Sequence, residues 1–290
     1  MPELPEIEAL AHFLHEKMAG QQVEHVDLVS IAALKTYDPP IDTIEGGAVK
    51  AVTRRGKYLL FEISKGVDSL WLVLHLARAG WVRYHESLTP GKARPRKGPL
   101  SFRLLLTDGR GIEITEAGTE KRLAVWAVRH PEEVQGVASL GVEPLGGELS
   151  DRSLAQLLSH DPHSLKAALS DQKLIAGIGN AYSDEILHAA RMSPFRSACK
   201  LGLDEVKRLH QAIVDVLEEA VERSKGLPAS GLKSEKRSGM SVHGRTGQDC
   251  PVCGDVVREV SFSSRSLQYC ATCQTGGKIL ADRRLSRLLK

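Results

Sequence analysis

The first apolar residues of the chain recur with the period of a helix. The residues that share one face are Ile7, Leu10, Leu14 and Met18. Gly20, of a residue type that commonly ends helices, lies two positions after Met18. This spacing predicts a helix over residues 6–18.

Short apolar runs come next, with turn signals such as Lys65-Gly66-Val67-Asp68 between them. Runs of this length and composition predict strands. The predicted strands cover residues 23–29, 51–53, 58–63, 70–76, 102–106, 112–115 and 124–128. Because no helical pattern interrupts them, we expect an antiparallel β-sandwich rather than a parallel sheet.

The pattern changes at residues 140–150, where Gly and Pro interrupt the apolar runs and indicate a linker. Helical spacing then returns at residues 153–158, 164–169 and 175–191, and in a long helix that Asp204 is expected to cap. Residues 226–247 contain few apolar side chains and predict a loop. Sheets followed by helices place the chain in the α+β class.

Composition narrows the class of protein. The chain has 290 residues, enough for two domains, and is 42% hydrophobic and 26% charged, as in ordinary globular proteins. No apolar run approaches the ~18 residues of a membrane span, and an acidic start argues against a signal peptide. We therefore expect a cytoplasmic protein, nucleoid-associated in a bacterium, with no membrane partner.

Charge gives a weaker signal. The net charge of +3 is too small to indicate a polyanionic partner, but the last residues carry a local basic excess. Its members are Lys278, Arg283, Arg284, Arg287 and Lys290. Aromatic residues make up 4% of the chain, which disfavours a base-stacking platform for single strands.

Four of the five cysteines form two C-x-x-C pairs. These are Cys250, Cys253, Cys270 and Cys273. The spacing predicts one structural zinc ion with a closed set of four thiolates. Two disulfides are the alternative, which the absence of an export signal disfavours. We expect the fifth cysteine, Cys199, to be a small buried residue.

The segment between the two cysteine pairs, residues 256–269, predicts a two-stranded hairpin. Arg258, Arg265 and several serines lie along it. Arginine and hydroxyl groups suit phosphate contacts, although a solvated loop would have a similar composition.

The N-terminus allows two interpretations. Met1 is normally removed before a small residue such as Pro2, and removal would leave a secondary amine that titrates near 8. Beside the carboxylates of Glu3 and Glu6, such an amine is suited to Schiff-base chemistry. Proline and acidic residues are also ordinary at the start of a helix, and taken alone the N-terminus favours that interpretation.

A glycine-containing turn, Gly177-Ile178-Gly179-Asn180, interrupts the helical pattern and precedes a strong helical run. Glycines permit close approach of a partner, and the start of a helix presents N–H groups that bind phosphate. A tight turn between two helices would look the same, so the turn by itself does not establish a binding site.

Taken together, these motifs resemble the formamidopyrimidine-DNA glycosylase / endonuclease VIII family of base-excision repair enzymes. The matching segments occur in order along essentially the whole chain. They are residues 1–8 (MPELPEIE), 54–60 (RRGKYLL), 177–187 (GIGNAYSDEIL), 243–247 (HGRTG) and the four-cysteine finger.

The resemblance implies a fold and its boundaries. An N-terminal antiparallel β-sandwich with flanking helices would carry the catalytic residues, and a helical domain with a helix–two-turn–helix motif would carry a β-hairpin zinc finger. The corresponding ranges are 1–135, a linker at 136–150, the helical domain at 151–242, the zinc finger at 243–275 and a basic tail at 276–290. We expect a monomer that binds damaged double-stranded DNA.

The resemblance also implies chemistry. Pro2, freed of Met1, would attack C1′ of the damaged nucleotide, Glu3 would protonate the opening sugar ring, and Glu6 would support the site. The expected activity is that of a bifunctional glycosylase and AP lyase, with β,δ-elimination after base removal. Because the damaged base must leave the stack first, the enzyme must hold the DNA backbone on both sides of the lesion.

Phosphate contacts are implied at four further positions, Lys57, His75, Asn180 and Arg265. Lys57 is also counted with the catalytic residues. Glu185 falls where the family has an acid that buttresses the site. Contacts of this type give affinity without reading the base sequence.

Three segments depart from the family pattern. The loop after residue 76, where a side chain usually fills the space left by the flipped base, offers Arg78. The second such loop, residues 116–123, lacks the family's aromatic residue and offers Arg122 or Leu123. Residues 230–242 are shorter than the loop that covers 8-oxoguanine in the purine-specific branch.

These departures leave several alternatives open. The lesion could be an oxidised purine, an oxidised pyrimidine or a bulkier, cross-linked base, and the preferred opposite base is not defined. A non-catalytic damaged-DNA-binding protein on the same scaffold is a further alternative, which the intact Pro2 and Glu3 disfavour. A zinc-ribbon RNA-binding factor would not account for the N-terminus.

Overall fold

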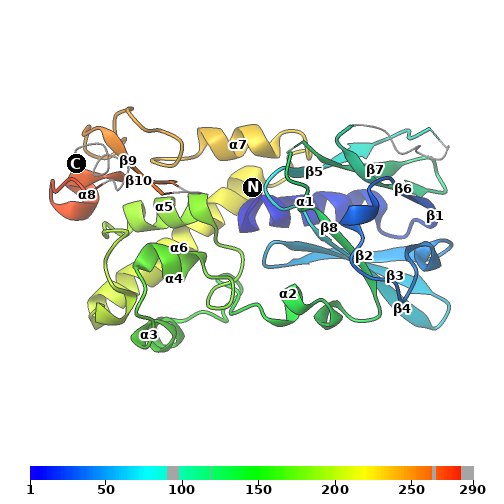
Figure 1. Cartoon of the computed structure of the whole chain (residues 1–290), viewed down its shortest axis with the longest axis horizontal. Coiled ribbons are helices and arrows are strands. Elements are labelled where there is room, and N and C mark those ends of the chain that lie inside the picture. The colour runs from blue at the N-terminus through cyan, green and yellow to red at the C-terminus, as the bar shows by residue number, and fades with distance from the viewer. Residues whose placement is uncertain (90–97, 118, 263–265, 282–290) are drawn as a thin grey trace. The chain divides into compact units, whose positions relative to one another are not determined.

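The protein folds into two units in a computed structural model that describes residues 1–89, 98–117, 119–262 and 266–281 (Figure 1). Unit 1 consists of Met1–Ser139 together with Ser224–Lys233. Unit 2 consists of Leu140–Arg223 together with Ser234–Lys290. The chain therefore passes between the units three times.

Unit 1 contains one long helix and two antiparallel sheets of four strands each, which confirms the predicted sandwich. The helix is α1 (Leu4–Met18). One sheet has the strand order β1 (Val23–Leu28), β6 (Leu100–Leu106), β7 (Gly111–Glu116) and β5 (Gly80–His85). The other has the order β2 (Ala48–Arg55), β3 (Tyr58–Lys65), β4 (Asp68–His75) and β8 (Ala124–Val128).

A single apolar core joins these elements. The buried face of α1 contributes Ile7, Leu10 and Leu14, and both sheets contribute alternate residues such as Phe61 and Phe102. Alternation with a period of two directs these side chains to one face of each sheet. The opposite face of the second sheet is covered by Val134 and Val137. Val137 lies in the short helix α2 (Gln135–Ala138), and Val134 precedes it. Strand β5 was not among the predicted strands, and its first two residues fall in the loop expected after residue 76.

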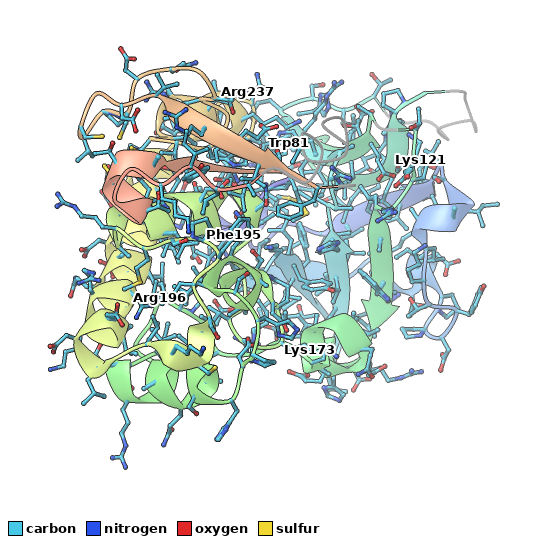
Figure 2. All side chains as sticks on the ribbon, turned by 60° about the vertical axis from the view of Figure 1, so that its left-hand side comes forward. Trp81, Lys121, Lys173, Phe195, Arg196 and Arg237 are labelled. Carbon is cyan, nitrogen blue, oxygen red and sulfur yellow. The ribbon has the colours of Figure 1, made fainter. Side chains whose placement is uncertain are left out.

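The ten residues Ser224–Lys233 pack with unit 1, although the sequence placed them in the helical domain. Ala229 and Leu232 are part of the core of unit 1. Trp81, labelled in Figure 2, is buried. Its Nε1 donates a hydrogen bond to the Ala229 carbonyl oxygen at 3.0 Å. The ammonium group of Lys233 lies 4.5 Å from the centre of the same indole ring. Burial of the aromatic side chain thus depends on residues more than a hundred positions away.

Unit 2 begins with helices. They are α3 (Asp151–Ser159), α4 (Leu165–Ser170), α5 (Asn180–Ala189) and α6 (Leu203–Ser224), whose last residue belongs to unit 1. Helix α7 (Leu232–Ser238) starts in unit 1 and ends in unit 2. Asp204 lies inside the first turn of α6 rather than at its cap, and α5 starts five residues later than predicted because Gly177 adopts a left-handed conformation. Helix α7 forms within the predicted loop.

The predicted hairpin of the finger is also present, as β9 (Val257–Ser261) and β10 (Ser266–Cys270), followed by the short helix α8 (Ala271–Thr275). Leu280 packs against this hairpin, and its backbone N–H donates to the hydroxyl of Tyr269 at 2.8 Å. Cys199 is exposed, contrary to expectation, because it lies in a surface turn with Ser197. No helix within the described ranges is long and apolar enough to cross a membrane.

Candidate functional site

The start of α1 combines a buried proline with two buried acids. Glu3 is the N-terminal cap of the helix, and the Glu3 and Glu6 side chains each bond the backbone N–H of the other residue. The Glu3 N–H donates to Oε2 of Glu6 at 2.8 Å. Pro2 is buried, and Glu3 is only 2% exposed. Glu6 thereby fixes the peptide that follows Pro2, while the helix positions the Glu3 carboxylate.

The β2–β3 turn is tied to the same helix. Helix α1 packs on β2 and β3, and Nε of Arg54 donates to Oε2 of Glu8 at 2.5 Å. Two residues separate the strands, because Arg55 pairs with Tyr58 across the hairpin. Lys57 is one of those two, so it lies in the turn just before the strand, and its side chain is buried.

His75 ends β4 directly opposite Tyr58 in β3. The two rings lie 4.8 Å apart between centres. Burial, and to a smaller extent the nearby charge of Lys57, lower the pKa of His75 from 6.5 to about 4. The structure thus brings Lys57 and His75 together, with a neutral imidazole that can donate one N–H at physiological pH.

The two loops proposed to fill a vacated base position pack against each other. Ala77 adopts a left-handed conformation, and the Gly80 N–H closes the turn on the Leu76 carbonyl at 2.8 Å, which leaves Arg78 exposed at the tip. A Cβ on Gly80 would lie 2.1 Å from that carbonyl oxygen and 3.0 Å from Leu123.

In the second loop, Leu123 is unsuited to the role suggested for it, because it is a core residue and only 3% exposed. The buried Glu116 carboxylate fixes this loop by accepting the N–H groups of Arg122 and Leu123 at 2.8 and 3.0 Å. The Arg122 side chain is exposed and pairs with Glu120.

In unit 2, the glycine turn leads into the first turn of α5. Gln172 holds the turn from inside, since its Oε1 accepts the Gly177 N–H at 3.0 Å and its Nε2 donates to the Ile178 carbonyl at 2.7 Å. Asn180 is the first residue of the helix, and its Nδ2 donates to the Ser266 carbonyl of β10 at 2.9 Å. The same residue thus belongs to the turn and is bonded to the finger hairpin.

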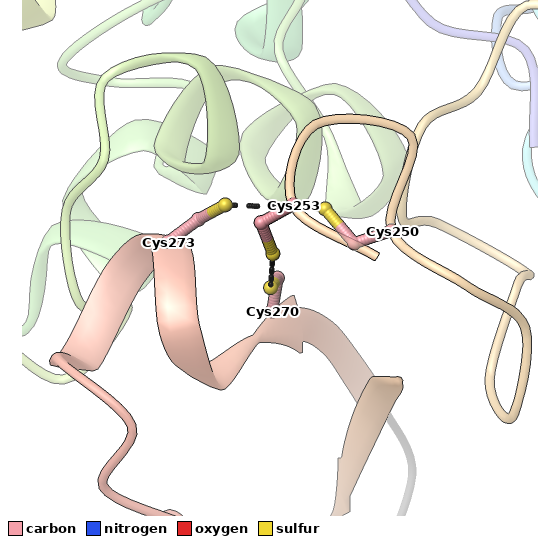
Figure 3. A group of neighbouring side chains, drawn as sticks. All are labelled: Cys250, Cys253, Cys270 and Cys273. Atoms are coloured by element: carbon pink, nitrogen blue, oxygen red, sulfur yellow. Dashed lines mark hydrogen bonds between the residues drawn. The ribbon is translucent and has the colours of Figure 1, made fainter. Parts of the chain in front are cut away.

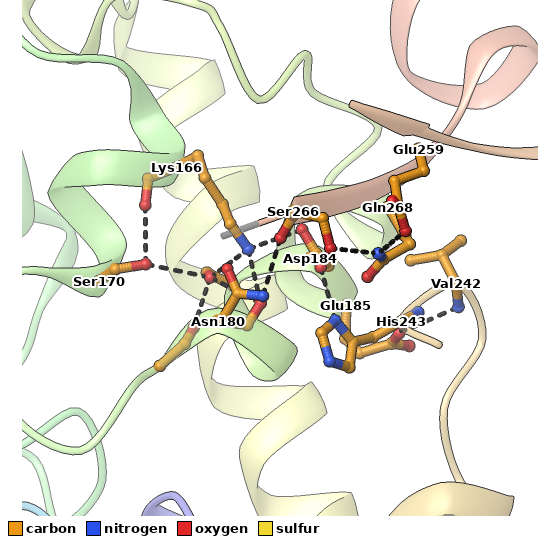
Figure 4. Close-up of polar contacts among 12 residues, drawn as sticks. Lys166, Ser170, Asn180, Asp184, Glu185, Val242, His243, Glu259, Ser266 and Gln268 are labelled. Atoms are coloured by element: carbon orange, nitrogen blue, oxygen red, sulfur yellow. Dashed lines mark hydrogen bonds and ion pairs between the residues drawn. The ribbon is translucent and has the colours of Figure 1, made fainter. Parts of the chain in front are cut away.

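A buried ionic network lies behind Asn180 (Figure 4). Nζ of Lys166 contacts the Asn180 carbonyl oxygen at 2.5 Å and Oδ1 of Asp184 at 2.6 Å. Oδ2 of Asp184 lies 2.7 Å from Nδ1 of His243. Asp184 is 1% exposed, so its charge is balanced by Lys166 and bonded by the imidazole. Sequence motifs gave no role to Lys166 or Asp184, whose only signal was a charge within an apolar helical run.

Glu185, the next residue, binds backbone instead of side chains. Its carboxylate accepts the N–H groups of Ser241 at 2.7 Å, Val242 at 2.9 Å and His243 at 2.8 Å. These three residues lead directly into the cysteine-containing segment. Glu185 therefore orders the backbone at the entry to the finger.

The four cysteines converge as predicted (Figure 3). Their Sγ atoms all lie within 4.8 Å of one another, with Cys253 and Cys270 at 3.3 Å and Cys250 and Cys273 at 3.9 Å. A tetrahedral zinc ion with bonds of about 2.3 Å requires thiolates roughly 3.8 Å apart. The residues present therefore fit one structural zinc ion.

Comparison with known proteins agrees with this arrangement. Family models describe residues 1–119 as a formamidopyrimidine-DNA glycosylase N-terminal domain, 140–230 as the H2TH domain of the same enzymes, and 247–276 as a zinc finger found in FPG and IleRS. The formamidopyrimidine-DNA glycosylase of Symbiobacterium thermophilum is 34% identical over 281 residues, covering 94% of this chain and 89% of that protein.

The chain belongs to the formamidopyrimidine-DNA glycosylase family.

Other members extend the comparison. An uncharacterized formamidopyrimidine-DNA glycosylase-like protein of Mycobacterium tuberculosis is 59% identical over 152 residues, which is 52% of this chain and 95% of that protein. The crystal structure of Thermus thermophilus MutM (Fpg) has a TM-score of 0.79 and 32% identity, covering 96% of this chain and all of that one. A Lactococcus lactis Fpg variant bound to Fapy-dG-containing DNA has a TM-score of 0.82 and 25% identity, covering 94% of this chain and all of that one.

The structure distributes the expected site residues of this family member between its two units. Unit 1 contains the start of α1, the Lys57 turn and the end of β4, and the last two lie close enough for Lys57 to lower the pKa of His75. Unit 2 brings Asn180 and Glu185 to the base of the finger. Arg265, predicted to contact phosphate, lies outside the described residues.

Proposed function

We propose that this protein removes damaged bases from double-stranded DNA and then cleaves the strand as an AP lyase, using the Pro2 amine exposed by removal of Met1. The observation that carries the proposal is the buried start of α1, where Glu3 and Glu6 are hydrogen-bonded around the residue that would bear the amine. Helix capping alone does not require proline at position 2 or burial of both acids.

The chemistry needs no group beyond the chain. The Pro2 nitrogen attacks C1′, the glycosidic bond breaks, and the base leaves with the bonding electron pair and takes up the proton that the Pro2 nitrogen loses. Glu3 delivers a proton to the ring oxygen as the sugar opens, which leaves an iminium at C1′. The iminium acidifies the C2′ hydrogen, so its removal expels the 3′ phosphate, and a second elimination expels the 5′ phosphate.

Each unit carries a set of candidate DNA contacts. In unit 1, the cation of Lys57 and the neutral N–H of His75 suit phosphate oxygens, and Arg78 projects from its turn. In unit 2, the Asn180 side chain and the N–H groups at the start of α5 are also suited to bind phosphate oxygens. Such contacts hold the backbone and leave base selection to the ease of flipping and to the pocket.

Borohydride reduction tests the proposal, because it converts the iminium into a stable bond between protein and DNA. The chain with its Pro2 amine exposed should be trapped on a duplex with an abasic site, whereas the same chain carrying an uncleaved N-terminal tag should not. Pro2→Gly should weaken or remove the trapped species. Absence of trapping on every abasic duplex would exclude the lyase step, and retained Met1 in an active preparation, seen by intact mass, would exclude the amine.

The second candidate function is recognition of damaged DNA without catalysis. It is favoured by the loop that Glu116 fixes, because this loop buries Leu123, one of the residues offered to fill the space of a flipped base. A panel of duplexes with oxidised purines, oxidised pyrimidines and cross-linked bases, each opposite all four bases, separates the two. Excision of any lesion supports the enzyme. Tight binding to a lesion with neither excision nor trapping would support the binding protein.

A further inference from the structure

His188 contacts a cysteine of the finger, a role that neither the sequence motifs nor the proposed DNA chemistry assigns to it. The residue lies in the last turn of α5, and its Nε2 is 3.3 Å from Sγ of Cys250. Both side chains are buried, with exposures of 5% for His188 and 2% for Cys250. The contact therefore lies in a dry environment, where a hydrogen bond is stronger than at the surface.

The chemistry of the finger fixes the direction of this hydrogen bond. A thiolate bound to zinc carries no proton and can only accept. A neutral imidazole has a single N–H, on one of its two nitrogens. When Cys250 binds zinc, Nε2 of His188 must therefore be the protonated nitrogen. Hydrogen bonds of this kind orient metal ligands, and their loss typically lowers metal affinity by about 10- to 100-fold.

A second contact ties the other cysteine pair to the same end of α5. Oε1 of the buried Gln274 accepts the Cys270 N–H at 2.9 Å, and its Nε2 donates to the Met192 carbonyl at 3.0 Å. Met192 follows α5 and bonds back to it through Leu187 at 2.9 Å. Each C-x-x-C pair thus has one hydrogen-bonded connection to the C-terminal end of this helix.

We propose that His188 is a positioning residue of the zinc site, donating its Nε2–H to the Cys250 thiolate and thereby fastening the zinc-loaded finger to α5. The role concerns retention of the metal and does not depend on the glycosylase and lyase chemistry. Since Asn180 at the other end of α5 bonds Ser266 of the hairpin, the helix is fastened to the finger at both ends.

The tautomer of His188 gives the most direct test, because it needs no substitution. Long-range ¹H–¹⁵N spectra of the zinc-loaded full chain should show a proton on Nε2. Replacement of zinc by ¹¹³Cd should add a coupling between the metal and the His188 Hε2 across the hydrogen bond. An unprotonated Nε2 would overturn the proposal.

Substitution gives an independent measure. His188→Phe keeps a flat ring but removes the donor, so competition with a chromophoric chelator should show zinc bound about 10- to 100-fold more weakly. His12→Phe is the matched control, since His12 is an exposed residue of α1, and its zinc affinity should equal that of the wild type. Wild-type affinity in a folded His188→Phe protein, checked by circular dichroism, would show that the ring only fills space and would refute the proposal.

Discussion

The backbone at the entry to the finger is held by the carboxylate of Glu185 rather than by a helix or strand. Substitution of Glu185 should therefore destabilise this segment selectively. Three successive backbone N–H groups, from Ser241 to His243, have this one side chain as their acceptor. Glu185→Gln removes the charge and turns one oxygen into an N–H₂ group, which faces at least one of the donors. Glu185→Ala removes the acceptor for all three.

The expected cost follows from the number of bonds lost. A hydrogen bond to a charged group contributes about 1.5–3 kcal/mol, and a buried donor left without an acceptor costs about 1–3 kcal/mol. We expect about 2 kcal/mol for Glu185→Gln and about 4 kcal/mol for Glu185→Ala, the latter less than the full sum because water enters the smaller side chain's place.

Amide hydrogen exchange measures this locally. Since 1.4 kcal/mol is a factor of ten, the three amides should exchange roughly 30-fold faster in Glu185→Gln and about 1,000-fold faster in Glu185→Ala. Glu218→Gln, an exposed position on α6, serves as the matched control and should leave these amides unchanged. Exchange within about threefold of the wild type in Glu185→Gln would refute the account of Glu185 as the organiser of this segment.

Three further predictions concern pH, packing and metal. Because the pKa of His75 is about 4 in the folded protein, against 6.5 ordinarily, the unfolded chain binds its proton first, so this residue destabilises the fold increasingly as the pH falls from 6.5 to 4. Between pH 7 and 4.5 the free energy of unfolding, measured in urea, should fall by about 1–3 kcal/mol less in His75→Gln than in the wild type. The same pH dependence in both proteins would contradict the lowered pKa of His75. Gly80→Ala places a Cβ 2.1 Å from the Leu76 carbonyl oxygen and should lower the free energy of unfolding by about 2–4 kcal/mol. In the control Gly202→Ala the nearest neighbour lies at 3.7 Å, and the change should be nearly neutral. Equal melting temperatures of the two variants would count against the packing described for the loop at Gly80. Removal of zinc by a chelator should abolish exchange protection in β9 and β10 but leave that of β3 and β4 intact, and a protected hairpin without metal would show that the finger folds unaided.

Much of the fold follows from local sequence patterns, and the exceptions have tertiary causes. Helix α7 was not predicted because Leu232 is its one strongly apolar residue. In the structure, the helix is stabilised by burial of Leu232 and by the ion pair between Arg223 and Glu235. The ammonium group of Lys236 also lies 4.7 Å from the centre of the Tyr182 ring. Strand β5 was missed because its glycine start resembles a loop. In the structure Gly80 is required by the close approach of Leu76.

The candidate site shows the same division. Pro2, Asn180 and the cysteines could be found because each lies in a compact motif. Lys166 lies in none of these motifs, and the contacts of Asp184 with Lys166 and His243 join separate segments of the chain. Only the fold shows that the aspartate has two partners and is almost completely buried.

The assignment of Ser224–Lys233 to unit 1 has a consequence for modularity. A chain ending at Ser139 would retain the N-terminal amine, α1 and both sheets, yet it would lack Ala229 and Leu232 from the core and the acceptor for the Trp81 indole. The N-terminal half is therefore not a self-sufficient cassette. A cut at the apparent linker would separate both sheets of unit 1 from a piece of their own core.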